Sequence, residues 1–182
     1  MAARLHDAAR STMSGRRLPI LALAALLAAP VVAGCKNTTM IPGTEIPDTP
    51  DNREILQVLE RFRTAFVRQD TAAIVATAHP TYYDESGTDD PGDDVVYEEL
   101  GPLLNRRLAQ VDSVRFTVEY LDVFVRNERA TVHVWVDASF HMKPILKEDG
   151  TPRLQPRFAR KQDYAKFELL RDGDSWRITK GI

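Results

Sequence analysis

The sequence predicts an α+β domain, with three helices packed on one face of an antiparallel sheet of about four strands. Two observations favour this fold class: apolar residues recur at helical spacing between residues 51 and 111, and they alternate with polar residues from residue 114 onward. A series of helices followed by a series of strands is typical of α+β domains. We therefore expect one folded domain at residues 51–182.

Capping residues mark the first two helices. Asp51 beside Pro50, with Glu54 three residues on, predicts the start of the first helix. The apolar stripe of this helix consists of Ile55, Leu59, Phe62 and Phe66. Asp70 is expected to cap a second, shorter helix that ends near residue 79.

The third helix is expected from about Val96 to Val111, because apolar residues again recur at helical spacing. Gly101-Pro102 lies inside it and is expected to kink or split it, since proline removes a main-chain hydrogen bond. The strands are expected at residues 114–120, 132–140, 158–170 and 176–180, joined by turns at 127–129 and 172–174 and by a longer loop at 143–156.

Residues 1–34 have the features of a secretory signal peptide. Four arginines and one acid precede a 16-residue apolar run, Leu18–Ala33, which contains two prolines. Spanning a bilayer takes about 20 apolar residues, so a signal peptide is favoured over the alternative, a short transmembrane anchor. The run ends in small residues directly before Cys35, the only cysteine of the chain.

The segment Val32-Ala33-Gly34-Cys35 resembles the lipobox of bacterial lipoproteins. That resemblance implies cleavage after Gly34, a diacylglyceryl group on the Cys35 thiol, and a lipid anchor in a membrane of the cell envelope. A buried free cysteine is the alternative. Lys36, in place of an aspartate, favours the outer membrane over the inner one. Residues 36–50 are rich in proline and threonine, so residues 35–50 are expected to be the lipidated cysteine and a flexible tether.

Charge and cysteine content exclude several functions. The net charge is −2, which argues against a nucleic-acid partner, and a single cysteine excludes an internal disulfide or a multi-cysteine metal site. His133 and His141 lie about 26 Å apart along one strand, so we expect no metal between them. The acidic segment 84–99 lacks the spacing of an EF-hand and is expected to be a solvated loop. Basic residues suited to anionic lipid heads or to a partner's acids surround the longer loop: Arg153, Arg157, Arg160 and Lys161.

Three stretches resemble a known superfamily, the nuclear transport factor 2-like proteins. Residues 62–70 are similar to its first helix, residues 78–83 to the exit of its second helix, and residues 167–178 to its closing hairpin. The superfamily includes ketosteroid isomerases and polyketide-cyclase-like proteins. The resemblance implies a cone-shaped domain with a curved sheet, a pocket between helices and sheet, and often a homodimer through the sheet. Functions in the superfamily are diverse, so the fold alone assigns none.

The candidate chemistry depends on which face of the sheet lines the cone. A site like that of a ketosteroid isomerase needs a carboxylate base and neutral donors in an apolar cavity. Asp137 is the candidate base, with Tyr82 and Tyr164 as donors, if its face of the strand lines the cone. If the neighbouring valines line it instead, this catalytic hypothesis fails. The side chains expected around a pocket are Tyr82, Tyr83, His133, Trp135 and Tyr164.

Two functions stay open at this point. The favoured one is a non-catalytic envelope lipoprotein whose domain binds a small apolar ligand or another envelope protein. The alternative is an isomerase, cyclase or dehydratase that uses a carboxylate in the pocket. A binding protein needs only an apolar cavity or an exposed patch, and a filled cone would favour the patch. We expect no cofactor besides the lipid on Cys35, and a homodimer is left open.

Overall fold

A computed structural model describes residues 39–88, 90–155 and 157–182. Asn37–Ile182 form one compact unit, and the core residues all belong to it. The expected signal peptide, Cys35 and the first residues of the expected tether lie outside the described residues. None of the helices in the described part of the chain is both long enough and apolar enough to cross a membrane.

Helix α1 (Pro50–Val67) begins two residues earlier than a cap at Asp51 predicts. Its N-cap is Thr49, whose side chain accepts a hydrogen bond from the Asn52 N–H at 3.1 Å. The predicted capping role of Asp51 is therefore wrong. Proline needs no main-chain partner in the first turn of a helix, so Pro50 can be the first helical residue and Thr49 the cap. Asp51 lies in the first turn and pairs with Arg171 instead.

The second helix starts where the sequence predicts. Asp70 caps α2 (Thr71–Val75), and its Oδ1 accepts a hydrogen bond from the Ala73 N–H at 3.0 Å. A small hairpin of β1 (Tyr83–Asp84) and β2 (Val95–Val96) then leads into α3 (Tyr97–Ala109). The segment between these two strands carries most of the acidic loop.

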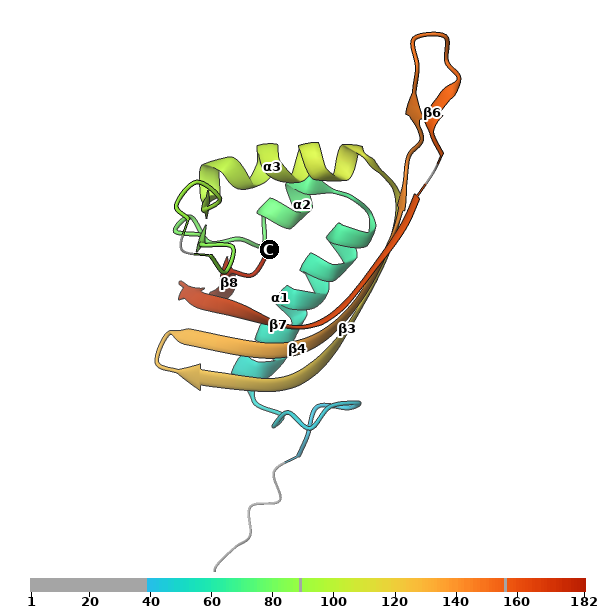
Figure 1. Ribbon diagram of the computed structural model, residues 1–182. Helices are drawn as coiled ribbons and strands as arrows, with labels where there is room; N and C mark the ends of the chain where they lie inside the picture. Colours follow the sequence, from blue (N-terminus) through green and yellow to red (C-terminus); the bar gives the residue numbers. More distant parts are fainter. Residues whose placement is uncertain (1–38, 89, 156) are drawn as a thin grey trace, which may run out of the picture. The chain divides into compact units, whose positions relative to one another are not determined.

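Pro102 does not split α3, contrary to our expectation. Figure 1 shows this helix as one uninterrupted run of turns. The missing N–H of Pro102 leaves only the Glu98 carbonyl without its helical partner, and Glu98 is exposed to solvent, which can replace that bond. Leu100, Leu104 and Leu108 are buried on both sides of the proline and hold the helix on the domain.

The main sheet is an antiparallel meander of four strands in the order β3-β4-β7-β8, as predicted. Its strands are β3 (Val111–Arg126), β4 (Arg129–Met142), β7 (Arg157–Asp172) and β8 (Ser175–Lys180). The segment expected as a longer loop contains a second small hairpin, β5 (Ile145–Leu146) and β6 (Pro152–Leu154). In Figure 1 the sheet curves around α1, and this hairpin projects beyond the ends of β4 and β7.

The concave face of the sheet packs directly against α1. Val132 and Val134 on β4 are both 0% exposed and belong to the core. Five phenylalanines lie between α1 and the sheet, and the neighbouring ring centroids are 5.0–6.3 Å apart. They are Phe62 and Phe66 on α1, Phe116 on β3, Phe140 on β4 and Phe167 on β7. Aromatic side chains thus fill the space that the cone would enclose along α1.

The folded domain begins before the predicted boundary at residue 51. Met40 forms a β-bridge with Pro47, and the Ile41 N–H donates to the Ile46 carbonyl at 2.9 Å. Ile46 is only 1% exposed and is part of the core. Residues 40–49, which we expected to lie in the tether, therefore belong to the domain. Ile41 and Ile46 pack on the core, and Asn52 on α1 donates a hydrogen bond to the Pro47 carbonyl at 2.8 Å. The overall composition of this proline-rich segment did not indicate these contacts.

Replacing Ile46 by alanine tests this assignment. Because the side chain is fully buried, the substitution is expected to lower the free energy of unfolding by about 2–5 kcal/mol. Chemical denaturation of residues 37–182 measures this change. Ile145→Ala is the matched control, since Ile145 is 49% exposed on the projecting hairpin and its loss should cost no more than about 0.5 kcal/mol. If both substitutions lowered the free energy of unfolding by the same small amount, residues 40–49 would belong to the tether and not to the folded domain.

Candidate functional site

Asp137, the candidate catalytic base, lies on the convex face of the sheet. It alternates along β4 with the buried valines, so its side chain points away from α1. Its carboxylate accepts hydrogen bonds from Arg160 Nε at 2.9 Å and Nη2 at 2.6 Å. The Arg160 guanidinium holds the pKa of Asp137 below its ordinary value, which makes the carboxylate a weaker base. The valines line the cone, and the catalytic hypothesis for Asp137 is therefore wrong.

The five predicted pocket residues do not come together. Trp135 and Tyr164 lie side by side on the convex face, with ring centroids 4.7 Å apart, and Tyr164 is 73% exposed. His133 lies on the same face, against the ring of Phe124. Tyr83 is half exposed and donates its hydroxyl proton to Asp94 in the acidic loop. Only Tyr82 is buried on the core side, so these residues cannot form one pocket.

Tyr82 joins distant parts of the chain. Its hydroxyl lies 3.3 Å from Asp84 Oδ2 and 3.2 Å from the Ile182 carbonyl, and it accepts a hydrogen bond from the Ile182 N–H at 3.1 Å. Asp84 Oδ2 also accepts from the Gly181 N–H at 2.9 Å. Burial, the largest cause, raises the pKa of Tyr82 above its ordinary value. These groups satisfy one another, so the cluster is a structural tie.

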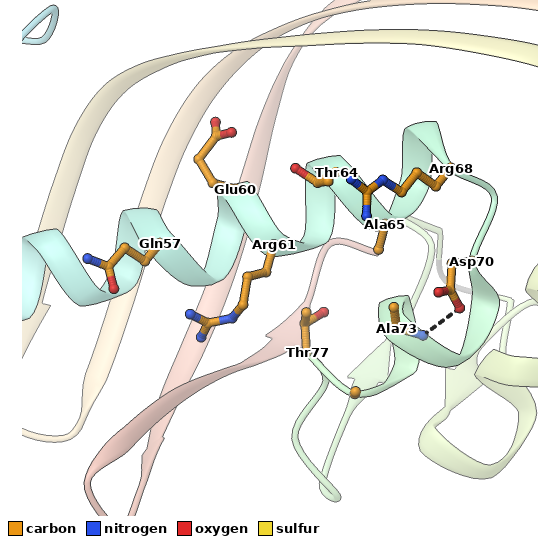
Figure 2. A pocket seen from close by; sticks show the side chains of 10 residues that line it. Gln57, Glu60, Arg61, Thr64, Ala65, Arg68, Asp70, Ala73 and Thr77 are labelled. Atoms are coloured by element: carbon orange, nitrogen blue, oxygen red, sulfur yellow. Dashed lines mark hydrogen bonds between the residues drawn. The ribbon is translucent and has the colours of Figure 1, made fainter.

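The surface offers a groove between α1 and α2, shown in Figure 2. Its volume is about 630 Å³. Its lining residues are Gln57, Glu60, Arg61, Thr64, Ala65 and Arg68 from the α1 side, and Asp70, Ala73, Ala76 and Thr77 from α2 and its flanking residues. The alanines provide an apolar floor, and charged side chains stand at the rim. In Figure 2 the Arg68 side chain turns back along α1 towards Thr64.

The acidic and basic side chains at this groove differ in whether they have partners. Glu60 is already engaged, because it accepts from the Tyr120 hydroxyl at 2.7 Å and from Arg63 Nε at 2.8 Å. The Asp70 carboxylate caps α2. Arg61 and Arg68 form no salt bridge with any other described residue. The groove therefore presents two cationic side chains beside an apolar floor, which suits an anionic group attached to an apolar body.

A second groove continues the first along α1. It has a volume of about 430 Å³ and shares Gln57 and Glu60 with the first groove. Ile41 and Pro42 from the N-terminal segment line its other side, together with Leu56 and Tyr120. Both grooves escaped sequence reasoning, since Gln57, Arg61, Thr64 and Arg68 form the ordinary polar face of an amphipathic helix. The one feature of the sequence that could have indicated a groove is the row of alanines in α2, which lies opposite the polar face of α1.

The described residues contain no group of three or more His, Cys, Asp or Glu side chains that could hold a metal ion. The acidic loop is instead held by its own hydroxyl and carboxylate groups. Thr88 Oγ1 donates to Asp93 at 2.8 Å, and the Ser86 hydroxyl donates to the Asp93 carbonyl at 2.9 Å. His133 and His141 lie at separate positions on β4.

Comparison with known proteins places the fold. No protein-family model matches the chain, and no curated protein matches its sequence. Solved structures do match. Kfla4162 of Kribbella flavida is 19% identical, with a TM-score of 0.57 over 72% of this chain and 87% of that one. A protein of Streptomyces avermitilis named as a dehydratase of the nuclear transport factor 2-like family is 14% identical, with a TM-score of 0.56 over 73% and 95%. This domain has the nuclear transport factor 2-like fold.

A ketosteroid isomerase-like protein of Erwinia carotovora atroseptica extends the comparison. It is 18% identical, with a TM-score of 0.54 over 74% of this chain and 95% of that one. At such identities the likeness concerns the fold alone, and the names of these proteins do not choose between ligand binding and catalysis. In this nuclear transport factor 2-like domain phenylalanines occupy the space between α1 and the sheet, and the groove described above lies between α1 and α2.

Proposed function

We propose that the chain is a lipid-anchored protein of the bacterial cell envelope whose nuclear transport factor 2-like domain binds a small amphipathic ligand without catalysis. The ligand has an apolar body and an anionic group, and it occupies the groove between α1 and α2. The observation that carries this proposal is the pairing of an apolar floor with Arg61 and Arg68, which have no acidic partners among the described residues.

The anchoring part of the proposal rests on the sequence. A basic start, an apolar run, small residues and the only cysteine follow one another in the order of a lipoprotein signal. A lipid on Cys35 would hold the domain at a membrane surface, with few residues between the anchor and Met40. Lys36 directs the protein to the outer membrane under the sorting rule of such lipoproteins.

The choice of binding over catalysis rests on the interior. An enzyme of the isomerase, cyclase or dehydratase type needs at least two polar groups that converge on a substrate in a water-poor pocket. Here Asp137 and Tyr164 lie on the outer face, and Tyr82 is engaged by main-chain groups. Turnover of a steroid enone by residues 37–182 would favour the catalytic alternative.

The arginines provide the test of the binding site. Titration of residues 37–182 with 1-anilinonaphthalene-8-sulfonate, an anionic probe with an apolar body, is expected to show saturable binding. The double variant Arg61→Ala/Arg68→Ala should raise the dissociation constant at least about tenfold, because hydrogen bonds to charged groups contribute about 1.5–3 kcal/mol each. Fluorescence enhancement measures the binding.

Two controls make this result specific. Arg126→Ala removes an exposed arginine at the end of β3 and should leave the affinity unchanged. Binding of Nile red, which is neutral, should change little in the double variant, because the apolar floor remains. If the double variant binds the anionic probe as tightly as the parent, the groove is not the site. Native mass spectrometry of protein purified gently from cells then identifies any retained ligand by its mass.

A further inference from the structure

Strand β7 has a long free edge. It pairs with β4 along almost its whole length, from Arg157 to Leu170, without a register shift. On its other side β8 pairs only with residues 168–172. Among the described residues, therefore, no strand covers the outer edge of residues 158–165. An uncovered edge presents unpaired N–H and C=O groups, which can serve as a template for another strand.

The free main-chain groups belong to the even-numbered residues. The Glu168 carbonyl accepts a hydrogen bond from Thr179 Oγ1 on the β8 side at 3.1 Å. The Arg171 N–H donates to the Glu128 carbonyl on the β4 side at 2.9 Å. Along a regular strand, successive residues direct their main-chain groups to opposite edges. Arg160, Gln162 and Tyr164 therefore direct N–H and C=O outwards.

We propose that this edge pairs with the same edge of a second copy of the chain, in an antiparallel arrangement about a two-fold axis at Gln162. In such a pair one residue faces its own counterpart across the axis. An axis at Lys161 or at Asp163 would place like charges opposite each other. An axis at Gln162 places Lys161 opposite Asp163 of the second copy. The two-fold symmetry also places Asp163 opposite Lys161 of the second copy, so there are two pairs of opposite charge.

The remaining pairs in this register are also compatible. Arg160 faces Tyr164 of the second copy on the convex side, and its charge is already matched by Asp137 of its own chain. Ala159 faces Ala165, so no bulky side chain obstructs the approach. Lys161 and Asp163 are 72% and 57% exposed and are 3.6 Å apart within one chain, so both can reach across the axis. Each facing pair of even-numbered residues exchanges two N–H···O bonds.

The edge is bounded at its far end. Gly181 lies against the Lys166 carbonyl, where a Cβ atom would stand only 2.6 Å from the oxygen, so the new ladder ends before Lys166. The result is a sheet continuous across two copies. This arrangement uses only the free edge of β7 and leaves the convex face with Trp135 uncovered.

Charge reversal tests the pairing. Sedimentation of residues 37–182, which contain the whole core, is expected to show a dimer over a concentration series. Lys161→Asp should raise the dimer dissociation constant at least about tenfold, because two attractive pairs become repulsive. The double variant Lys161→Asp/Asp163→Lys should restore dimerisation, since opposite charges face each other again. Lys147→Asp, which makes the same change in charge on the projecting hairpin, should have no effect.

Cysteine substitution tests the register. Residues 37–182 contain no cysteine, so an introduced thiol has no competitor. Gln162→Cys should form a disulfide-linked dimer on oxidation, because facing residues of such a pair lie about 5.5 Å apart between Cα atoms. Tyr164→Cys should not form this disulfide. In the proposed register residue 164 faces residue 160 of the second copy, so the two introduced cysteines lie four residues apart along the strands. A monomer at all concentrations, a dimer unaffected by Lys161→Asp, or cross-linking at Tyr164 alone would overturn the proposal.

Discussion

Replacing Phe62 by alanine is expected to lower the free energy of unfolding by about 3–5 kcal/mol. The Phe62 side chain is 4% exposed, and its ring lies 5.4 Å from that of Phe167 and 6.1 Å from that of Phe116. Truncation therefore leaves a cavity in the centre of the packing between α1 and the sheet. Denaturant unfolding of residues 37–182, monitored by circular dichroism, measures the loss.

An exposed phenylalanine provides the control for this experiment. Phe124 is 57% exposed on the convex face, so Phe124→Ala should change the stability by no more than about 0.5 kcal/mol. A loss below about 1 kcal/mol for Phe62→Ala would show that the cavity collapses at little cost or that the site is loosely packed. The space inside the cone would then become a candidate ligand site again, in place of the groove.

Cys35→Ser is expected to abolish lipid attachment completely. Cys35 is the only thiol of the chain, so no other residue can accept the diacylglyceryl group. Each buried CH₂ of an acyl chain contributes about 0.8 kcal/mol to membrane binding, and loss of two or three chains removes stable anchoring. Incorporation of radiolabelled palmitate and the intact mass of the detergent-extracted protein measure this change. A variant that still carries acyl mass would contradict the lipoprotein assignment.

Lys36→Asp separates anchoring from sorting. The variant keeps the cysteine and should therefore keep its lipid label. It should move from the outer to the inner membrane fraction when the two membranes are separated by density. Unchanged lipidation with changed location would confirm that the residue after Cys35 determines only the destination, while loss of the label would mean that Lys36 acts earlier, in processing.

The types of the secondary structure elements could be predicted because each depends on local pattern. Asp70 caps α2 through its own side chain, and the alternation along β4 requires an extended strand whatever its partner. Errors arose where a single residue shifted a boundary. Pro50, as the first helical residue, moved the cap of α1 from Asp51 to Thr49, and burial of Ile46 attached residues 40–49 to the domain.

The site could not be predicted, because it depends on relations between elements. Alternation along β4 shows that Asp137 and Val134 point to opposite faces, but it does not show which face receives α1. The Asp137–Arg160 ion pair depends on the register between β4 and β7, which joins residues 23 positions apart. The groove depends on how α2 lies against α1. The fold could be predicted because its elements depend on local sequence pattern. These contacts could not, because they depend on how the elements pack against one another.

The tie around Tyr82 has a consequence for how the chain is made. The His79 N–H donates to the Ile178 carbonyl at 2.8 Å, and the Tyr82 hydroxyl bonds to Ile182, 100 positions along the chain. Contacts between distant residues form slowly, since a large loop must close first. The ribosome must therefore deliver almost the whole polypeptide before the segment that follows α2 can make these contacts.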